Sequence, residues 1–216
     1  IFQSMQPSGH IVLNGDDDKL ATVDGYHGVK PVFFGLDAKH DVYADQIVSR
    51  GLKGVSCRIH MGKDAFDVLV PTPGIHMVYN ALAAAAVGRI YGLTIEEIKR
   101  GIESLETIRG RFKMIETENF LVVDDCYNAN PMSMKASLDV LHDGGGRRVA
   151  ILGDMGELGE NEISLHEEVG EHAAKCGIDV CICVGELSSH IAEAARKADP
   201  DFEVHYEKDR ESLLKN

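Results

Sequence analysis

Two adjacent acids stand at the end of an apolar segment, just before a polar turn. The segment reads Val122-Val123-Asp124-Asp125-Cys126-Tyr127-Asn128-Ala129-Asn130-Pro131. Asn is a preferred N-cap and Pro fits the first helical position, so a helix is predicted from Pro131. Open α/β sheets bind ligands at the carboxyl ends of strands, where a carboxylate such as Asp125 can accept hydrogen bonds from ribose hydroxyls. Asp124 is expected on the opposite face of the strand. A capped strand-to-helix turn without a ligand is the alternative.

A pair of arginines precedes this segment, in the run Arg109-Gly110-Arg111-Phe112. A guanidinium group suits phosphate because it donates two parallel, charge-assisted hydrogen bonds. Arg111 is therefore a candidate phosphate ligand. Two solvated arginines on a linker are the alternative interpretation.

A single amide, Asn80, lies in the otherwise apolar run that starts at Gly74-Ile75-His76-Met77. A buried amide must be hydrogen-bonded, and a primary amide both donates and accepts, so it can pair with the edge of an adenine. A hydrogen bond from Asn80 to local backbone is the alternative.

A glycine-rich acidic segment follows the apolar run 149–152. It reads Gly153-Asp154-Met155-Gly156-Glu157-Leu158-Gly159, and His166 comes soon after it. Its place after a predicted buried strand is where open α/β sheets hold ligands. A flexible loop and a structural histidine are the alternatives.

The first half of the chain predicts a small sheet followed by two helices. Strands are predicted at 10–14, 32–34, 55–61 and 66–70, and the last two alternate as a hairpin with one buried face. A nearly uncharged helix is predicted at 77–91, buried on most sides. Thr94-Ile95-Glu96-Glu97 forms a capping box that opens a second helix to about Ser104.

The second half alternates strands and helices, which predicts βαβ units and a parallel sheet. The solid apolar run at 149–152 is typical of a strand covered on both faces. A capping box at Ser164 predicts a helix to about Cys176. The strands are expected at 112–115, 120–123, 147–152, 180–184 and 203–206, and the last helix at 189–197. The fold class is therefore α/β, with a domain boundary near 107–110.

Composition narrows the possible partners. A formal net charge of −13 over 216 residues argues against nucleic acid and anionic membranes. No apolar run is long enough to predict membrane insertion. Five cysteines without a C-x-x-C pair are interpreted as reduced thiols, and a metal site would need closer clustering with histidine. The chain does not begin with Met, so we expect it to be part of a longer protein.

Taken together, these motifs resemble the Mur ligases of peptidoglycan synthesis, over about residues 1–184. The resemblance is carried by Gly74-x-His76-x-x-x-Asn80-Ala81-Leu82-Ala83-Ala84, by Gly110-Arg111-Phe112, by the segment from Asp124 to Met134, and by the loop from Gly153 to Gly159 with His166. It implies a cytoplasmic enzyme that forms amide bonds with ATP and Mg²⁺ through an acyl phosphate. The branch resembled most is the one that joins D-alanyl-D-alanine to UDP-N-acetylmuramoyl-tripeptide.

The resemblance also implies roles for single residues. It identifies residues 1–108 as the C-terminal portion of a central ATP-binding domain and 109–216 as a truncated Rossmann-like C-terminal domain. A set of ATP ligands is implied: Asn80, Arg111, Asp125 and Tyr127. Near the nucleotide site it implies His76 and Asn128, and on the dipeptide side it implies Asp154, Met155, Glu157 and Leu158.

The sequence departs from the family pattern in several large respects: it contains no Gly-x-x-Gly-Lys-Thr phosphate loop, and the family's UDP-binding domain and Lys-Gly-Ser-type segment are not found in it. The family's carbamylated lysine and Mg²⁺ ligands would fall before Ile1, and no catalytic residue is assigned within the chain. We therefore expect these 216 residues alone to be inactive. A non-catalytic nucleotide- or peptide-binding module, or a ligase of the same fold with another substrate, is the alternative.

Overall fold

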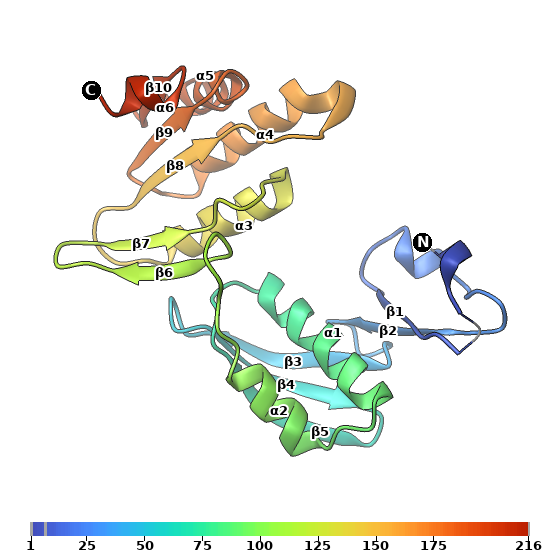
Figure 1. Cartoon of the computed structure of the whole chain (residues 1–216). Coiled ribbons are helices and arrows are strands. Elements are labelled where there is room, and N and C mark those ends of the chain that lie inside the picture. Colours follow the sequence, from blue (N-terminus) through green and yellow to red (C-terminus); the bar gives the residue numbers. More distant parts are fainter. Residues whose placement is uncertain (1, 7, 216) are drawn as a thin grey trace. The chain divides into compact units, whose positions relative to one another are not determined.

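The computed structural model describes residues 2–6 and 8–215. The chain divides into two compact units, unit 1 from Ile1 to Glu106 and unit 2 from Thr107 to Asn216. Both units combine sheets and helices, which confirms the α/β prediction (Figure 1). No helix within the described residues is long and apolar enough to cross a membrane.

Unit 1 contains a five-stranded mixed sheet. Its order is β1 (Ile11–Asn14), β2 (Pro31–Gly35), β3 (Val42–Ser49), β4 (Val55–Met61) and β5 (Asp64–Val70). The first three strands are parallel, and β3, β4 and β5 pair antiparallel. The β4–β5 hairpin confirms the prediction from alternation, since every second residue of β4 is buried. Strand β3 was not predicted.

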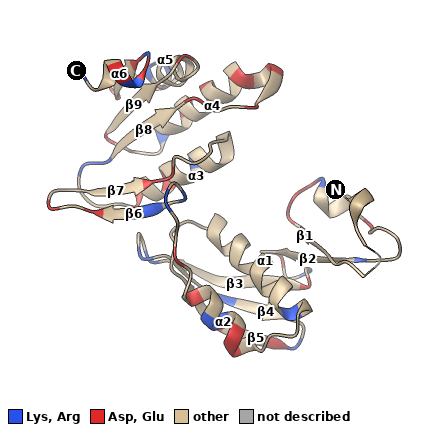
Figure 2. Ribbon diagram, viewed as in Figure 1, with Lys and Arg blue, Asp and Glu red and all other residues tan. Residues whose placement is uncertain are grey.

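Two helices cover one face of this sheet (Figure 1): α1 (His76–Ile90) and α2 (Ile95–Glu103). Thr94 and Glu97 form the predicted capping box of α2. Most of the charge on this pair of helices lies on α2, as Figure 2 shows, whereas α1 carries only Arg89. The prediction that α1 is buried on most sides is confirmed, and the exposed residues of the helix are Asn80, Ala84, Val87 and Arg89.

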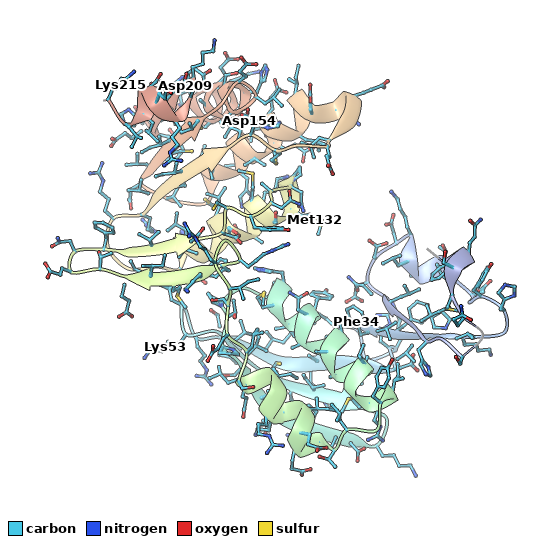
Figure 3. The ribbon with its side chains drawn as sticks, in the orientation of Figure 1. Phe34, Lys53, Met132, Asp154, Asp209 and Lys215 are labelled. Carbon is cyan, nitrogen blue, oxygen red and sulfur yellow. The ribbon has the colours of Figure 1, made fainter. Side chains whose placement is uncertain are left out.

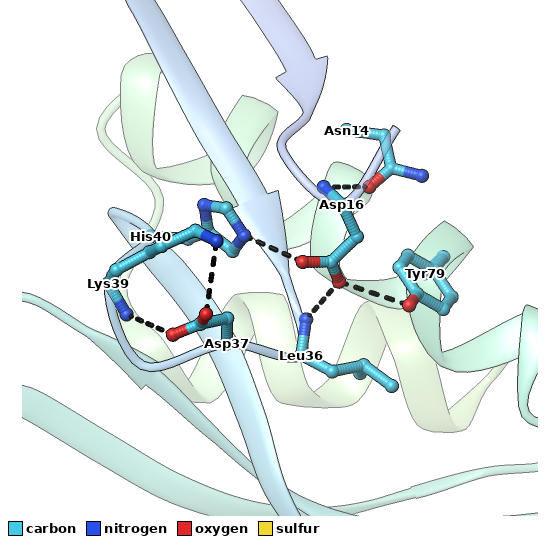
Figure 4. A network of polar contacts seen from close by, with 7 residues as sticks. All are labelled: Asn14, Asp16, Leu36, Asp37, Lys39, His40 and Tyr79. Carbon is cyan, nitrogen blue, oxygen red and sulfur yellow. Dashed lines mark hydrogen bonds and ion pairs between the residues drawn. The ribbon is translucent and has the colours of Figure 1, made fainter. Parts of the chain in front are cut away.

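A hydrogen-bonded network joins the ends of β1 and β2 to α1 (Figure 4). Asp16 Oδ2 accepts from the backbone N–H of Leu36 at 2.6 Å and from the Tyr79 hydroxyl at 3.0 Å, and Oδ1 pairs with His40 Nε2 at 2.8 Å. Partial burial raises the pKa of the Asp16 carboxyl, but these hydrogen bonds outweigh it and leave the pKa below its usual value. Burial and the bond to Asp16 raise the pKa of Tyr79 to about 12. The phenol therefore remains a donor.

We expect this network to make unit 1 sensitive to acid. The depressed pKa of Asp16 gives stability that is present above the unfolded-state pKa of about 4 and is lost as the pH falls through the lower folded-state pKa. Asp16→Asn should therefore flatten the pH dependence of melting in that window. NMR signals from β1 and α1, followed during thermal unfolding from about pH 2.5 to pH 7, measure the effect.

Asp67→Asn is the matched control, because Asp67 pairs with Arg58 at the surface, where an ion pair contributes little. It should leave the acid profile of unit 1 nearly unchanged. A parental profile in Asp16→Asn would refute this role of the network.

Unit 2 begins with a hairpin and continues with a separate parallel sheet. Strands β6 (Lys113–Glu116) and β7 (Leu121–Asp124) pair antiparallel as a two-stranded sheet. Strands β8 (Val149–Gly153), β9 (Val180–Val184) and β10 (Glu203–Glu207) form a parallel sheet in the order β10-β9-β8. The predicted parallel sheet is therefore confirmed for these three strands and is wrong for β6 and β7.

Three helices connect these strands: α3 (Pro131–His142), α4 (Glu162–Lys175) and α5 (Ser188–Ala198), with a short α6 (Arg210–Leu213) after β10. Side chains from all three connecting helices share one core with Ala150, Cys181 and Cys183. Successive right-handed crossovers that step in one direction place their helices on the same face of a sheet. The other face of β8 stays open, with Ile151 63% exposed, so the prediction of a strand covered on both faces is wrong.

The ends of two of these helices test the capping predictions. Asn130 caps α3 and Pro131 occupies its first position, as predicted. The capping box at Ser164 is wrong, because α4 already begins at Glu162 after a 3-10 turn at Gly159–Asn161, and the Ser164 hydroxyl donates to the Asn161 carbonyl. All five cysteines are free thiols, and Cys181 and Cys183 share one strand face as expected.

Candidate functional site

In unit 2 the β6–β7 hairpin brings the arginine turn beside the two acids. Lys113 pairs with Asp124, so the residues before Lys113 lie next to those after Asp124. The backbone N–H of Tyr127 donates to the Gly110 carbonyl at 3.0 Å, which closes this arrangement. Two sequence motifs thereby become one structural feature, named below the junction turn (residues 109–112 with 124–127).

Both acids hold the backbone of the junction turn. Asp124 Oδ2 accepts from Gly110 N–H at 3.1 Å, and Asp125 Oδ1 accepts from Phe112 N–H at 3.0 Å. Phe112 is buried and has φ +53°, a strained conformation for a residue with a side chain. Both carboxylates therefore bond to backbone amides of the same turn.

The second oxygen of Asp125 contacts a residue that the sequence did not indicate. Ser137 Oγ, on α3, donates to Asp125 Oδ2 at 2.7 Å. The helix start at Pro131 was the available signal, because it places Ser137 within the second turn of the helix that follows this strand end. Each oxygen of Asp125 thus has one partner, and a carboxylate oxygen can accept a further hydrogen bond.

A cation–π pair forms the exposed part of the junction turn. The guanidinium carbon of Arg111 lies 4.0 Å from the centre of the Tyr127 ring, and Tyr127 is 70% exposed. Arg111 makes no ion pair within the described residues, so its N–H groups remain available to an anion. Asn128 follows, also exposed.

Cys126 beside this pair is held as a thiol. Its Sγ donates to Asp124 Oδ1 at 3.0 Å, and this bond, with the nearby charge, raises the pKa of Cys126. The same bond, together with Gly110 N–H, holds the pKa of Asp124 below its usual range although desolvation opposes it. Cys126 is therefore poorly suited to act as a nucleophile.

In unit 1, His76 and Asn80 lie one turn apart on α1 and therefore share a face. Asn80 is exposed rather than buried, which corrects the expectation of a buried amide. Its Nδ2 contacts Met77 Sδ at 3.4 Å, and its exposed amide remains accessible to a ligand. His76 is half-buried.

The loop from Gly153 to Gly159 follows β8, and Figure 3 labels Asp154 at this strand end. Asp154 Oδ1 accepts from the N–H of Ser188 at 2.7 Å and from its hydroxyl at 2.6 Å, at the start of α5. Met155 is 1% exposed and packs in the core of unit 2. Glu157 is exposed, whereas Leu158 is half-buried and packs against the core of unit 2.

A metal site built from protein side chains needs several ligating groups close together. Within residues 2–6 and 8–215, no group of three or more His, Cys, Asp or Glu side chains could hold a metal ion. The described residues therefore provide no site in which protein side chains alone would surround a metal ion.

Comparison with known proteins agrees with the motifs in both units. Residues 1–88 match the model of the Mur ligase middle domain, and residues 110–216 match that of the Mur ligase, glutamate ligase domain. UDP-N-acetylmuramoyl-tripeptide--D-alanyl-D-alanine ligase of Escherichia coli (strain K12) is 35% identical over 197 residues, 90% of this chain and 44% of the relative. The ligase of the same name from Bacillus subtilis (strain 168) is 32% identical over 98% of this chain and 44% of the relative.

A solved structure shows the same likeness. The UDP-N-acetylmuramoylalanyl-D-glutamyl-2,6-diaminopimelate--D-alanyl-D-alanyl ligase from Acinetobacter baumannii superposes with a TM-score of 0.83 at 27% identity, covering 99% of this chain and 45% of that one. The chain spans less than half the length of these relatives. Two domain models of one family match in order along nearly the whole chain, and the fold agrees, so the chain belongs to the Mur ligase family.

Proposed function

We propose that the protein that carries this chain is a cytoplasmic ligase that uses ATP to join D-alanyl-D-alanine to UDP-N-acetylmuramoyl-tripeptide. The supporting observation is the agreement along 90% and 98% of this chain with relatives that bear this name, together with the junction turn, whose exposed arginine and half-buried carboxylate suit a nucleotide. The ligase would phosphorylate the tripeptide carboxylate, and the dipeptide amine would displace phosphate from the acyl phosphate to form the amide. Residues 1–108 would belong to the central ATP-binding domain and 109–216 to the C-terminal domain.

Within unit 2 we assign the nucleotide contacts to the junction turn. Arg111 would donate to a phosphate, since its guanidinium lies over the Tyr127 ring and makes no ion pair within the described part of the chain. Asp125 would accept from ribose hydroxyls with its remaining lone pairs, beside Tyr127 and Asn128.

In unit 1 we assign Asn80 to the edge of the adenine, with His76 at the periphery, because both directions of an exposed amide can pair with a base. A solved Mur ligase from Thermotoga maritima contains ADP, but it is 23% identical and its likeness is one of fold. Mg²⁺ stays a prediction of the family resemblance, and no step is assigned to it here.

We assign the loop from Asp154 to Leu158 to the side of the site that binds the acceptor, D-alanyl-D-alanine. Asp154 and Met155 anchor it, and Glu157 and Leu158 would face the incoming dipeptide. A dipeptide carries an ammonium group before reaction, which an exposed carboxylate such as Glu157 can bind.

The test is the reaction of the whole protein. Phosphate release and the amide product are measured with MgATP, UDP-N-acetylmuramoyl-tripeptide and D-alanyl-D-alanine, and then with each substrate omitted. We expect product only when all three are present. Nucleotide binding without product would instead indicate a binding module, and product with another acceptor would indicate a ligase of the same fold with a different substrate.

A further inference from the structure

His166 is a buried titratable group to which the proposed reaction gives no role. Its side chain is fully buried in α4, yet both ring nitrogens have backbone partners. The N–H of Met155 donates to Nε2 at 3.0 Å, and Nδ1 lies 2.6 Å from the Glu162 carbonyl oxygen. The first of these bonds reaches from α4 into the middle of the loop Gly153 to Gly159.

These partners determine the tautomer of the ring. A backbone N–H can only donate, so Nε2 must accept and carries no hydrogen. A carbonyl oxygen can only accept, so the single proton of the neutral imidazole must lie on Nδ1. Both nitrogens are then satisfied without solvent, as a buried polar side chain requires.

The loop has a second anchor on the other side. Asp154 caps the start of α5 through Ser188, and the α carbon of Gly185 lies so close that a Cβ there would come within 2.3 Å of Asp154 Oδ1. Between these anchors and α4, Glu157 adopts φ +61°, a strained conformation for a residue with a side chain. Such strain persists only where the surroundings hold it in place.

We propose that His166 is a positioning residue: its neutral Nδ1–H imidazole clamps Met155 and thereby fixes Gly156, Glu157 and Leu158 in one conformation. The clamp acts through the backbone and not through the side chain of Met155. Its consequence for the dipeptide rests on the proposed function, since it assumes that this loop faces the acceptor.

Two substitutions separate the two hydrogen bonds. The terminal amide of Gln reaches the position of Nε2 and can accept from Met155 N–H, whereas the shorter Asn reaches only the position of Nδ1 and can serve Glu162 alone. His166→Gln should therefore keep the loop in place, and His166→Asn should release it. His172→Gln, which changes a half-buried histidine of the same helix paired with Asp139, is the matched control.

The readout is NMR of the ¹⁵N-labelled 216-residue chain. In the parent, imidazole ¹⁵N shifts should show the Nδ1–H tautomer, and the Met155 amide should be protected from exchange. In His166→Asn, Met155 should lose protection by about tenfold or more, and Gly156 to Leu158 should become mobile on the ps–ns scale, while protection in β9 persists. Equal loop behaviour in the Asn and Gln variants, or an Nε2–H tautomer in the parent, overturns the clamp.

Kinetics of the whole protein then address the acceptor. In His166→Asn, kcat/KM for D-alanyl-D-alanine should fall by about tenfold or more. KM for ATP should not change, because the released segment from Gly156 to Leu158 lies only on the acceptor side. If the loop is released but dipeptide kinetics do not change, the clamp stands and the acceptor-side assignment of the loop fails.

Discussion

Replacing Gly170 by alanine is expected to destabilise unit 2 by about 3 kcal/mol, which lowers the melting temperature of a domain of this size by about 10–20 °C. Gly170 lies on α4, on the side of the helix that packs against α5. An added Cβ would come within 2.2 Å of the Ile191 carbonyl oxygen. That oxygen belongs to helix backbone and cannot rotate away. The helices must therefore separate, and the shared core with Cys181 and Cys183 loses its packing.

A glycine-to-alanine substitution in unit 1 should have the opposite effect on stability. Gly101 lies inside α2, and a Cβ there would meet no atom within 4 Å. Gly101→Ala should stabilise unit 1 by about 0.5–1 kcal/mol, because alanine loses less backbone entropy in a helix. Calorimetry of both variants, with NMR signals assigned to each unit, checks the pair. A Gly170→Ala protein that melts like the parent would show that α4 and α5 are packed less closely than described.

The second large effect is expected at Asp125. Asp125→Ala removes the partners of Phe112 N–H and of the Ser137 hydroxyl, and a hydrogen bond to a charged group contributes about 1.5–3 kcal/mol. The junction turn should therefore loosen and unit 2 should lose about 3 kcal/mol of stability. If Asp125 also binds ribose, kcat/KM for ATP in the whole protein should fall by about 10- to 100-fold.

Asp125→Asn separates these two roles. The amide oxygen can still accept from Phe112 N–H, so the turn should be largely retained, but the charge that would hold the ribose hydroxyls is gone. A variant that melts like the parent and has a raised KM for ATP supports the ribose contact. Asp125 acts on the fold alone under two conditions. The kcat/KM for ATP must equal that of the parent in Asp125→Asn, and in Asp125→Ala it must fall only as far as the lower melting temperature accounts for.

Asp124→Ala completes the comparison. It removes the bonds to Gly110 N–H and to the Cys126 thiol but leaves Asp125 in place. We expect a smaller loss of ATP efficiency than in Asp125→Ala. A greater loss in Asp124→Ala at equal melting temperature would move the ribose contact to Asp124.

Several parts of the fold could be predicted because local chemistry and tertiary packing agree there. Strict alternation in β4 predicted a one-sided strand, and the capping residues Thr94 and Asn130 marked true helix starts. Strand β3 was missed because a bulge between Asp45 and Val48, with Gln46 at φ +50°, interrupts the alternation that identifies a strand. The box at Ser164 failed because the preceding 3-10 turn had already started the helix.

The candidate site was predictable as a list of residues but not as a geometry. Residue type and position indicated Arg111 and Asp125, and the family resemblance added Tyr127, but neither indicated that Asp124 and Asp125 hold the backbone of one turn. The left-handed φ of Phe112 turns the chain so that both acids meet its backbone, and no residue preference announces such an angle at a phenylalanine. The exposure of Asn80 could not be predicted either, because an Ala-rich helix with almost no charge is expected to be buried on most sides.

The reactivity of the Cys126 thiol reports whether the junction turn is intact. Among the described cysteines it alone is exposed, and alkylating reagents attack the thiolate, which its bond to Asp124 disfavours. The rate of labelling at Cys126 is therefore tied to the intactness of the turn: slow while Asp124 accepts from the thiol, and faster once that bond is broken. A reagent that consumes one cysteine can thus follow whether a nucleotide tightens or loosens the turn, without any assay of catalysis.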